Sequence, residues 1–372
     1  MNQKRLLSVD ALRGLAIAGM ILVNTPGSWA FIYPPLKHAK WNGCTPTDVI
    51  FPLFLFIVGM SISLSMNKLK NGSISMSSVL PKIIPRTAII FGLGLFLSAF
   101  PFDESFSNLR IMGVLQRIAL CYCAGSFIYL FTSYKLRILF IPGILIAYSI
   151  ALISFTFPDG FGNSLSMNEN LVRYIDLFIL GENHMYQVSG VPFDPEGLLS
   201  TFPAITTTLL GSLVGDFIIS KRSLSEKRQV FFISGLIGIF AGLILNIWFP
   251  LNKQLWSSSF VLYSAGWGLV ILSFFTWLVE ERKNEKWVMP CIIIGSNPLF
   301  IFVASSLVVR IITRIEIQTV DSGTSLYTFI YTHLFASWAG NLNGSLLFAV
   351  SWILIWFGIA EVLYRKKIFI KI

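Results

Sequence analysis

Long apolar runs, separated by short polar or charged stretches, make up most of this sequence. A helix needs about 20 mostly apolar residues to cross the hydrocarbon core of a bilayer. The pattern predicts an all-α polytopic membrane protein, a single transmembrane domain over residues 1–372 with a long loop at about 157–198. Ten windows have the required length, near residues 9–30, 47–66, 84–101, 109–131, 137–156, 199–220, 229–249, 258–279, 288–311 and 345–364.

Two further features refine this pattern. The apolar segment from Leu326 to Trp338 is too short to span a bilayer, so we expect an interfacial or re-entrant helix there. The ninth window contains the sequence Gly295-Ser296-Asn297-Pro298, whose glycine and proline break a helix. A helix that is broken at membrane depth usually lines a cavity.

Charge alternates from loop to loop. Lysines and arginines precede the first span and follow the second, fourth, sixth, eighth and tenth spans. The intervening loops hold acidic residues such as Asp103, Glu104 and Asp159. By the positive-inside rule both termini are cytoplasmic, and the loop after the first span and the long loop at 157–198 lie outside.

The composition excludes several classes of function. The chain is 55% hydrophobic and 12% charged, whereas a soluble domain carries about 25% charged residues. Its net charge of +10 comes from basic residues beside the spans, so it does not indicate nucleic-acid binding. The four cysteines lack metal-ligand spacing, and we expect neither a metal site nor a disulfide. The first apolar segment carries Asp10 and Arg13, which argues against a cleavable signal peptide.

One outer loop carries candidate chemistry. His38, one of only three histidines, lies there beside Trp41 and Asn42, and Asp48 follows at the start of the second span. A neutral imidazole can take a proton from an amine or carry an acyl group. The alternative is an interfacial histidine that only packs near lipid headgroups. Asn24 lies near the outer end of the first span, at a similar depth.

Arginines at membrane depth are a second signal, because such residues usually face a protein interior. Asp10 and Arg13 are three residues apart and can pair. Arg110 and Arg117 are seven apart, which predicts a shared helix face, and Arg86 enters the third span from the cytoplasmic side. Guanidinium groups along this route suit an anionic ligand, and snorkelling is the alternative.

Polar residues also gather on the outer side. Asp194 and Glu196 precede the sixth span, and Lys253 and Trp256 lie between the seventh and eighth. Together with Trp41, Asn42 and Asp48 they suit a polyhydroxylated ligand, because polar side chains bind hydroxyls and an indole packs on a sugar ring. The alternative is helix capping and an ordinary aromatic belt.

Taken together, these segments resemble the heparan-α-glucosaminide N-acetyltransferase family, including its bacterial relatives. The resemblance covers most of the ten-span core, and the order of the motifs makes the set specific although each motif alone is weak. The motifs are Arg5-Leu6-Leu7-Ser8-Val9-Asp10-Ala11-Leu12-Arg13-Gly14, His38-Ala39-Lys40-Trp41-Asn42-Gly43 with Asp48, Phe51-Pro52, Arg110-Ile111-Met112-Gly113-Val114-Leu115-Gln116-Arg117, Phe193-Asp194-Pro195-Glu196-Gly197 and Asn252-Lys253-Gln254-Leu255-Trp256-Ser257.

The resemblance implies an enzyme that takes acetyl-CoA from the cytoplasmic side and passes the acetyl group to a glucosamine amine on the far side of the bilayer. The family's active histidine corresponds to His38 and a nearby asparagine to Asn24. The human enzyme works in lysosomes and has an N-terminal region that this chain lacks. We therefore expect a bacterial plasma membrane, and the family leaves a homodimer open.

Roles follow for the candidate residues. Arg86 would contact the CoA phosphates, with Arg117 and Asn297 beside the pantetheine arm. His38 would act as a base or as an acetyl carrier, and Asn24 would donate to the oxyanion. Asp48, Asp194 or Glu196 would orient the imidazole or bind sugar hydroxyls.

Other functions stay open at this point. A sugar or glycan transporter would need no CoA, and an O-acetyltransferase of a surface glycan would use the same donor. A scaffold subunit would not need so many buried polar residues. The acceptor itself, whether free glucosamine, a peptidoglycan fragment or the end of a glycosaminoglycan, is not encoded in any motif.

Overall fold

The computed structural model describes residues 6–72, 75–156, 165–188, 190–318 and 323–370. Within these ranges, nine helices are long and apolar enough to cross a membrane, which confirms the all-α polytopic class. They are α1 (Leu7–Asn24), α2 (Pro46–Lys70), α3 (Met76–Ala99), α4 (Val114–Phe131), α5 (Tyr134–Ser154), α7 (Thr201–Ile219), α8 (Leu224–Leu245), α9 (Ser258–Phe275) and α14 (Asn341–Arg365).

The predicted ninth span is divided in two, as its sequence indicated. It comprises α10 (Met289–Ile294) and α11 (Pro298–Ile312), and the break falls at Gly295-Ser296-Asn297. Proline supplies no backbone N–H and is therefore well suited to the first position of α11. The short apolar segment is also helical, through α12 (Leu326–Ile330), the π-helical turn η6 (Tyr331–Ala336) and α13 (Ser337–Ala339).

The remaining elements are short and lie in the connections. The predicted loop at 157–198 contains the helix α6 (Leu171–Leu180), which the sequence analysis missed, while Asp159 lies outside the described residues. The terminal motif residue Arg5 also lies outside them. The other short elements are η1 (Pro34–Leu36), η2 (Phe106–Asn108), η3 (Glu182–His184), β1 (Gln187–Val188) paired with β2 (Val191–Pro192), η4 (Thr276–Glu281), η5 (Glu285–Trp287), and β3 (Glu316–Gln318) paired with β4 (Gly323–Ser325).

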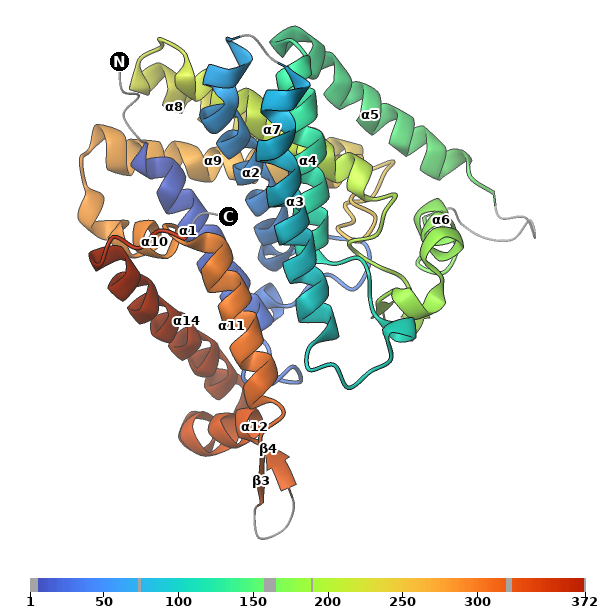
Figure 1. The fold of residues 1–372 in the computed structure, drawn as a ribbon, viewed down its shortest axis with the longest axis vertical. Helices are drawn as coiled ribbons and strands as arrows, with labels where there is room; N and C mark the ends of the chain where they lie inside the picture. Colours follow the sequence, from blue (N-terminus) through green and yellow to red (C-terminus); the bar gives the residue numbers. More distant parts are fainter. Residues whose placement is uncertain (1–5, 73–74, 157–164, 189, 319–322, 371–372) are drawn as a thin grey trace.

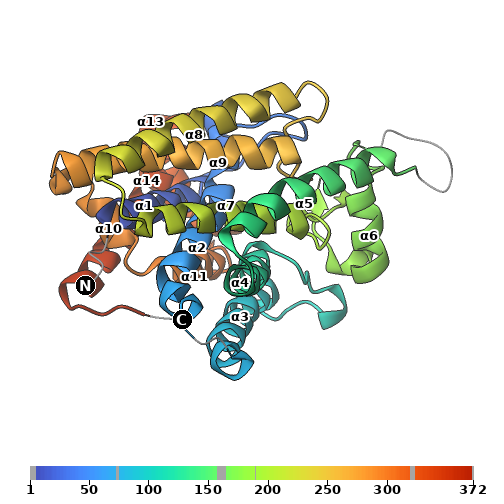
Figure 2. The same cartoon turned by 90° about the horizontal axis from the view of Figure 1, so that it is seen from above.

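Helix α2 forms the centre of the bundle. It packs against α1, α4, α7 and α9 (Figure 1). Within its most apolar stretch of 18 residues, 67% of the residues are buried. Figure 2 shows α8 and α9 side by side along one face, with α3 and α4 together on another. In the outer helices α3, α5, α8 and α14, only 17–28% of the residues in the most apolar 18-residue stretch are buried. Their exposed apolar faces are suited to contact lipid.

The central helices α2 and α7 touch backbone to backbone. A Cβ atom on Gly59 would lie 1.8 Å from the carbonyl oxygen of Thr208, and one on Gly211 would lie 1.9 Å from that of Phe56. Small residues permit this close approach between membrane helices. The contact fixes the position of two helices that begin beside the candidate site described below.

Replacing Gly59 with alanine is therefore expected to destabilise the protein by about 1–3 kcal/mol, because the methyl group overpacks the helix interface. Gly92 is the matched control, since it also lies within a helix but has no atom within 4 Å of an added Cβ. Thermal unfolding in detergent measures both. Equal midpoints for Gly59→Ala and Gly92→Ala would contradict this packing.

A buried polar network joins four helices in the half of α2 distant from Asp48. Asp216 accepts hydrogen bonds from Ser63 Oγ at 2.6 Å and from the Tyr129 hydroxyl at 2.9 Å, and it forms an ion pair with Arg137. Arg137 also donates to Ser212 Oγ at 2.9 Å. The network links α2, α4, α5 and α7 and satisfies the charge of Arg137, so we assign it a structural role.

Candidate active site

His38 and Asp48 form a hydrogen-bonded pair. Asp48 lies in the first turn of α2, where its Oδ2 completes a capping box by accepting the backbone N–H of Thr45 at 3.0 Å. Its Oδ1 lies 2.7 Å from His38 Nδ1. The Asp48 side chain is 1% exposed and that of His38 is 44% exposed. The buried carboxylate thus holds Nδ1, and Nε2 is the imidazole nitrogen available to a ligand.

Lys253 is the third member of this cluster. Its Nζ lies 3.1 Å from His38 Nδ1 and 3.6 Å from Asp48 Oδ1. Burial lowers the pKa of the Lys253 ammonium, while Asp48 and Glu196 act in the opposite direction. When Nδ1 donates its proton to Asp48, the ammonium pairs with the carboxylate and not with the ring. His38 and Lys253 thus share one carboxylate, that of Asp48.

Lys253 reaches His38 because two loops are joined. The backbone N–H of Gly43 donates to the Leu251 carbonyl at 2.7 Å, and the Asn252 amide donates to Asn42 Oδ1 at 3.1 Å. Gly43 has a φ of +112°, a conformation that glycine adopts without strain. Asn42, predicted to bind substrate, therefore joins the two loops of the site.

Trp41 connects the same loop to the segments on either side of α6. Its indole Nε1 donates to the Leu165 carbonyl at 2.9 Å, and its ring packs edge-on against Phe193 with centroids 5.2 Å apart. The side chain is partly exposed, so part of it stays open to a ligand. Trp41 thus positions the His38 loop.

Arg110 binds two carboxylates of the predicted acceptor site. It contacts Asp194 through Nε at 2.9 Å and Nη2 at 2.7 Å, and Glu196 through Nη2 at 2.7 Å. Burial alone would raise the pKa of the Glu196 carboxyl. The positive charges of Arg110, Arg117 and Lys253 outweigh burial, so this pKa is lowered overall. Asp194 is fully buried, so its carboxylate orders the protein and offers no surface to a sugar.

The predicted shared helix face of Arg110 and Arg117 was wrong. Helix α4 begins only at Val114, because the chain is extended at Gly113, with φ −177° and ψ −176°. Arg110 therefore lies in the preceding loop, where it can reach the segment before α7.

Arg117 and Trp256 lie inside the protein, each with 0% exposure. The guanidinium carbon of Arg117 lies 5.0 Å from the centroid of the Trp256 ring, and Nη2 donates to the Gly197 carbonyl at 3.0 Å and to Ser200 Oγ. Trp256 also packs against Phe51. Because the indole has no exposed face, the structure does not present it as a platform for a sugar.

A second site is a cavity of about 360 Å³. It is lined by Arg13, Phe54, Ile57, Val58, Ser61, Ile62, Ser65, Arg86, Ile90, Ile118, Tyr122, Ser296, Pro298, Leu299 and Ile370. Arg13 pairs with Asp10 at 2.9 Å, which confirms that predicted pair, and it donates to Ser61 at 3.1 Å. Arg86 stacks over the Tyr122 ring at 4.8 Å. The cavity thus combines two guanidinium groups, three serine hydroxyls, a tyrosine and an apolar wall.

This cavity includes only one of the three predicted CoA contacts. Arg86 lines it, whereas Arg117 and Asn297 do not. The Asn297 side chain instead anchors the C-terminal segment, donating to the Ile368 carbonyl at 3.0 Å and accepting from the Ile370 N–H at 2.7 Å. The helix break next to Asn297 does line the cavity, through Ser296 and Pro298, as a broken span was expected to do.

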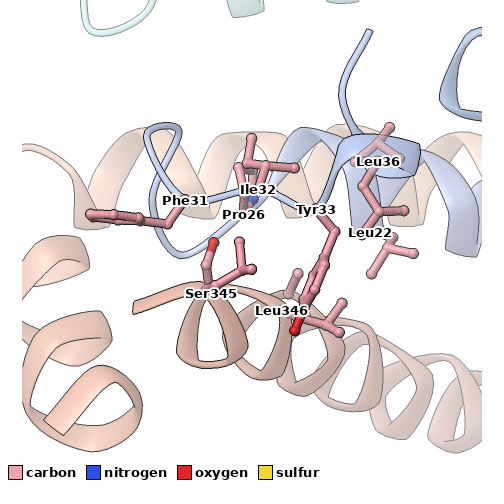
Figure 3. Close-up of a pocket in the computed structure, with 11 residues that line it drawn as sticks. Leu22, Pro26, Phe31, Ile32, Tyr33, Leu36, Ser345 and Leu346 are labelled. Carbon is pink, nitrogen blue, oxygen red and sulfur yellow. The ribbon is translucent and has the colours of Figure 1, made fainter. Parts of the chain in front are cut away.

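Asn24 is the last residue of α1 and is exposed, so its amide is open to a ligand. The chain that follows lies over α14, where the Gly27 N–H donates to the Ser345 carbonyl at 3.1 Å. Figure 3 shows Tyr33 beside Leu346 there, with Pro26 next to Ile32. These residues line an apolar pocket of about 10 Å³. This pocket is too small for a sugar, and Asn24 does not line it.

The fold and these two sites define an integral membrane protein with a histidine–carboxylate pair near the start of its central helix and an arginine-lined cavity deeper in the bundle. The family model described as heparan-alpha-glucosaminide N-acetyltransferase, catalytic, matches residues 5–249. The chain belongs to this family.

Two curated relatives are similar along the whole chain. Human heparan-alpha-glucosaminide N-acetyltransferase is 27% identical over 421 aligned residues, which cover 99% of this chain and 60% of the human protein. The mouse protein of the same name is 28% identical over 424 residues, with coverages of 100% and 61%. The chain thus spans about 60% of the length of the curated relatives that it matches.

Proposed function

We propose that this protein is a transmembrane N-acetyltransferase that moves the acetyl group of cytoplasmic acetyl-CoA to the amine of a glucosamine-type sugar on the outer side. The His38–Asp48 pair carries this proposal, because a carboxylate at 2.7 Å from Nδ1 orients an imidazole whose Nε2 is free to act on a substrate. The names of the human and mouse relatives support the same reaction.

His38 and Asp48 would share the proton transfer. An amino sugar is mostly protonated at neutral pH and becomes a nucleophile only when it loses a proton. The neutral amine attacks the thioester carbonyl through its lone pair, and Nε2 of His38 takes the further proton that the nitrogen loses as the C–N bond forms, while Asp48 stabilises the imidazolium through Nδ1–H. In the alternative ping-pong path, Nε2 itself accepts the acetyl group before the sugar does. Asn24, Trp41 and Asn42 would then lie on the acceptor side.

The cavity provides the donor site in this proposal. Guanidinium groups bind phosphate oxygens, so Arg13 and Arg86 suit the phosphates of CoA. Ser61 and Ser65, with the apolar wall, suit the amides and methylenes of the pantetheine arm. By the positive-inside pattern this half of the bundle faces the cytoplasm and His38 faces outward, in what we propose is a bacterial plasma membrane.

Arg86→Ala is expected to weaken CoA binding about 10-fold or more, because a charge-assisted contact is lost. Arg222 is a suitable control, since its side chain is 61% exposed. Calorimetric titration of purified protein with CoA measures both variants. Equal dissociation constants for Arg86→Ala, Arg222→Ala and wild type would show that the phosphates bind elsewhere.

Acetyl transfer from labelled acetyl-CoA to glucosamine by purified protein tests the function directly. Labelled N-acetylglucosamine supports the proposal, whereas label on a glycan hydroxyl would indicate an O-acetyltransferase. Flux of sugar through proteoliposomes without any CoA affinity would indicate a transporter and overturn the proposal.

A further inference from the structure

Arg117 is a buried cation whose hydrogen bonds are incomplete. It is 0% exposed, and its Nη2 is bound by Gly197 and Ser200. Its Nε and Nη1, however, have no hydrogen-bond partner among the described residues. Two nitrogens of one guanidinium, which carry three N–H groups between them, thus have no acceptor among the described residues. Buried donors are normally satisfied, and each exception calls for an explanation.

The charge of Arg117 is also unmatched at close range. Glu196, Asp194 and Asp176 act on it electrostatically, but none of them forms an ion pair with it in the described part of the chain. Arg137, equally buried, pairs directly with Asp216. A charge without a partner at membrane depth is costly, and ionisable residues there commonly serve function.

The location of Arg117 is the third observation. On its own helix, Ile118 and Tyr122 line the arginine-lined cavity. Its side chain points instead to Gly197, which follows Glu196 directly, and to Trp256, three residues after Lys253. Arg117 therefore contacts both regions through its neighbours, the cavity through its own helix and the His38–Asp48–Lys253 cluster through the two segments that carry Glu196 and Lys253.

Strain at Trp256 points to the same place. Its φ is +52°, a region that bulky side chains rarely adopt. Residues held in such conformations gather at functional sites, because the surrounding structure must enforce them. Here the indole lies under the guanidinium, and no acceptor among the described residues reaches Nε or Nη1.

We propose that Arg117 is a catalytic residue whose Nε and Nη1 bind the carbonyl oxygen of the acetyl thioester. This inference rests on the proposed acetyltransferase function. As the C–N bond to the amine forms, the carbonyl π electrons move to oxygen, and Arg117 stabilises that negative charge. The C=O bond then re-forms, the C–S bond breaks, and CoA leaves as its thiolate while the amine proton goes to His38.

Two unreactive analogues test this assignment by binding alone. In the first, a methylene replaces the sulfur of acetyl-CoA and the carbonyl is kept; in the second, the carbonyl is also replaced by a methylene. Wild type is expected to bind the ketone about 10- to 100-fold more tightly, since a hydrogen bond to a charged donor is at stake. Arg117→Gln and Arg117→Lys should reduce this preference, whereas Ser200→Ala, which removes only one of the two contacts of Nη2, should keep it.

The outcomes are distinguishable. Wild-type protein that binds both analogues equally overturns the role of Arg117, whether or not the variants fold, and leaves the acetyltransferase intact. A preference that survives in Arg117→Gln overturns it as well. Failure of wild type to bind either analogue or CoA itself overturns the proposed function and this inference with it. Loss of the preference in Arg117→Gln, with CoA still bound, supports the assignment.

Discussion

His38→Ala will lower kcat for acetyl transfer by about 10²–10⁴-fold, the usual contribution of a general base, and will eliminate transfer if His38 carries the acetyl group. CoA binding will stay close to that of wild type, because His38 does not line the arginine-lined cavity. Rates with labelled acetyl-CoA and glucosamine, beside calorimetric CoA titration, separate the two effects.

The matched control is His333→Ala. His333 is exposed in η6, and within the described part of the chain its ring hydrogen-bonds to its own helical segment alone, at Phe329 and Thr332. We expect this variant to turn over like wild type. Unchanged turnover in His38→Ala, or an equal loss in both variants, would remove His38 from the chemistry.

Arg110→Ala will destabilise the fold by about 3–5 kcal/mol, the range found when one partner of a buried ion pair is removed. It strands the carboxylates of Asp194, which is fully buried, and of Glu196, which is 11% exposed. Both precede α7, so the loss should also loosen the segment that contacts Arg117. Thermal unfolding in detergent measures the effect.

Arg314→Ala provides the comparison, because Arg314 pairs with Asp103 at the surface, with side chains 59% and 44% exposed. Exposed pairs contribute about 0–1 kcal/mol, so this variant should unfold near the wild-type temperature. Adding Asp194→Asn to Arg110→Ala should restore part of the stability, since a neutral amide is less costly to bury unpaired. Identical thermal-unfolding midpoints for Arg110→Ala and Arg314→Ala would show that the ion pairs of Arg110 with Asp194 and Glu196 do not stabilise the fold.

The sequence predicted the helices well because their signal is long-range apolar composition. Each of the ten windows contains a helix, and the Gly295–Pro298 break was recognised from two residues whose backbone chemistry is decisive. The start of α4 was placed too early because the hydropathy averaged over a long window stays high across Arg110. In the structure, the loop that contains Arg110 continues to Gly113, whose backbone is extended, and α4 begins at the next residue. Helix α6 was missed because it is amphipathic and short, with turn residues around it.

The site was harder to predict than the helices. Asp48 was a candidate because it lies close to His38 in sequence, and a capping position brought the two together. Lys253 lies 215 residues from His38, and only the folded loops show that the two side chains meet. Arg13 was recognised as the partner of Asp10, but nothing in a single sequence indicated that it also lines a cavity with Arg86.

The most direct measurement uses sealed proteoliposomes with glucosamine trapped inside and labelled acetyl-CoA added outside. Protein oriented with its cavity outward should form labelled N-acetylglucosamine within the vesicles. Protein in the opposite orientation meets neither substrate on the correct side, so a mixture of orientations lowers the yield but does not obscure the result. Protein-free vesicles and His38→Ala vesicles exclude leakage. Labelled product that forms only when both substrates share one side would contradict transfer across the membrane from the cavity to His38.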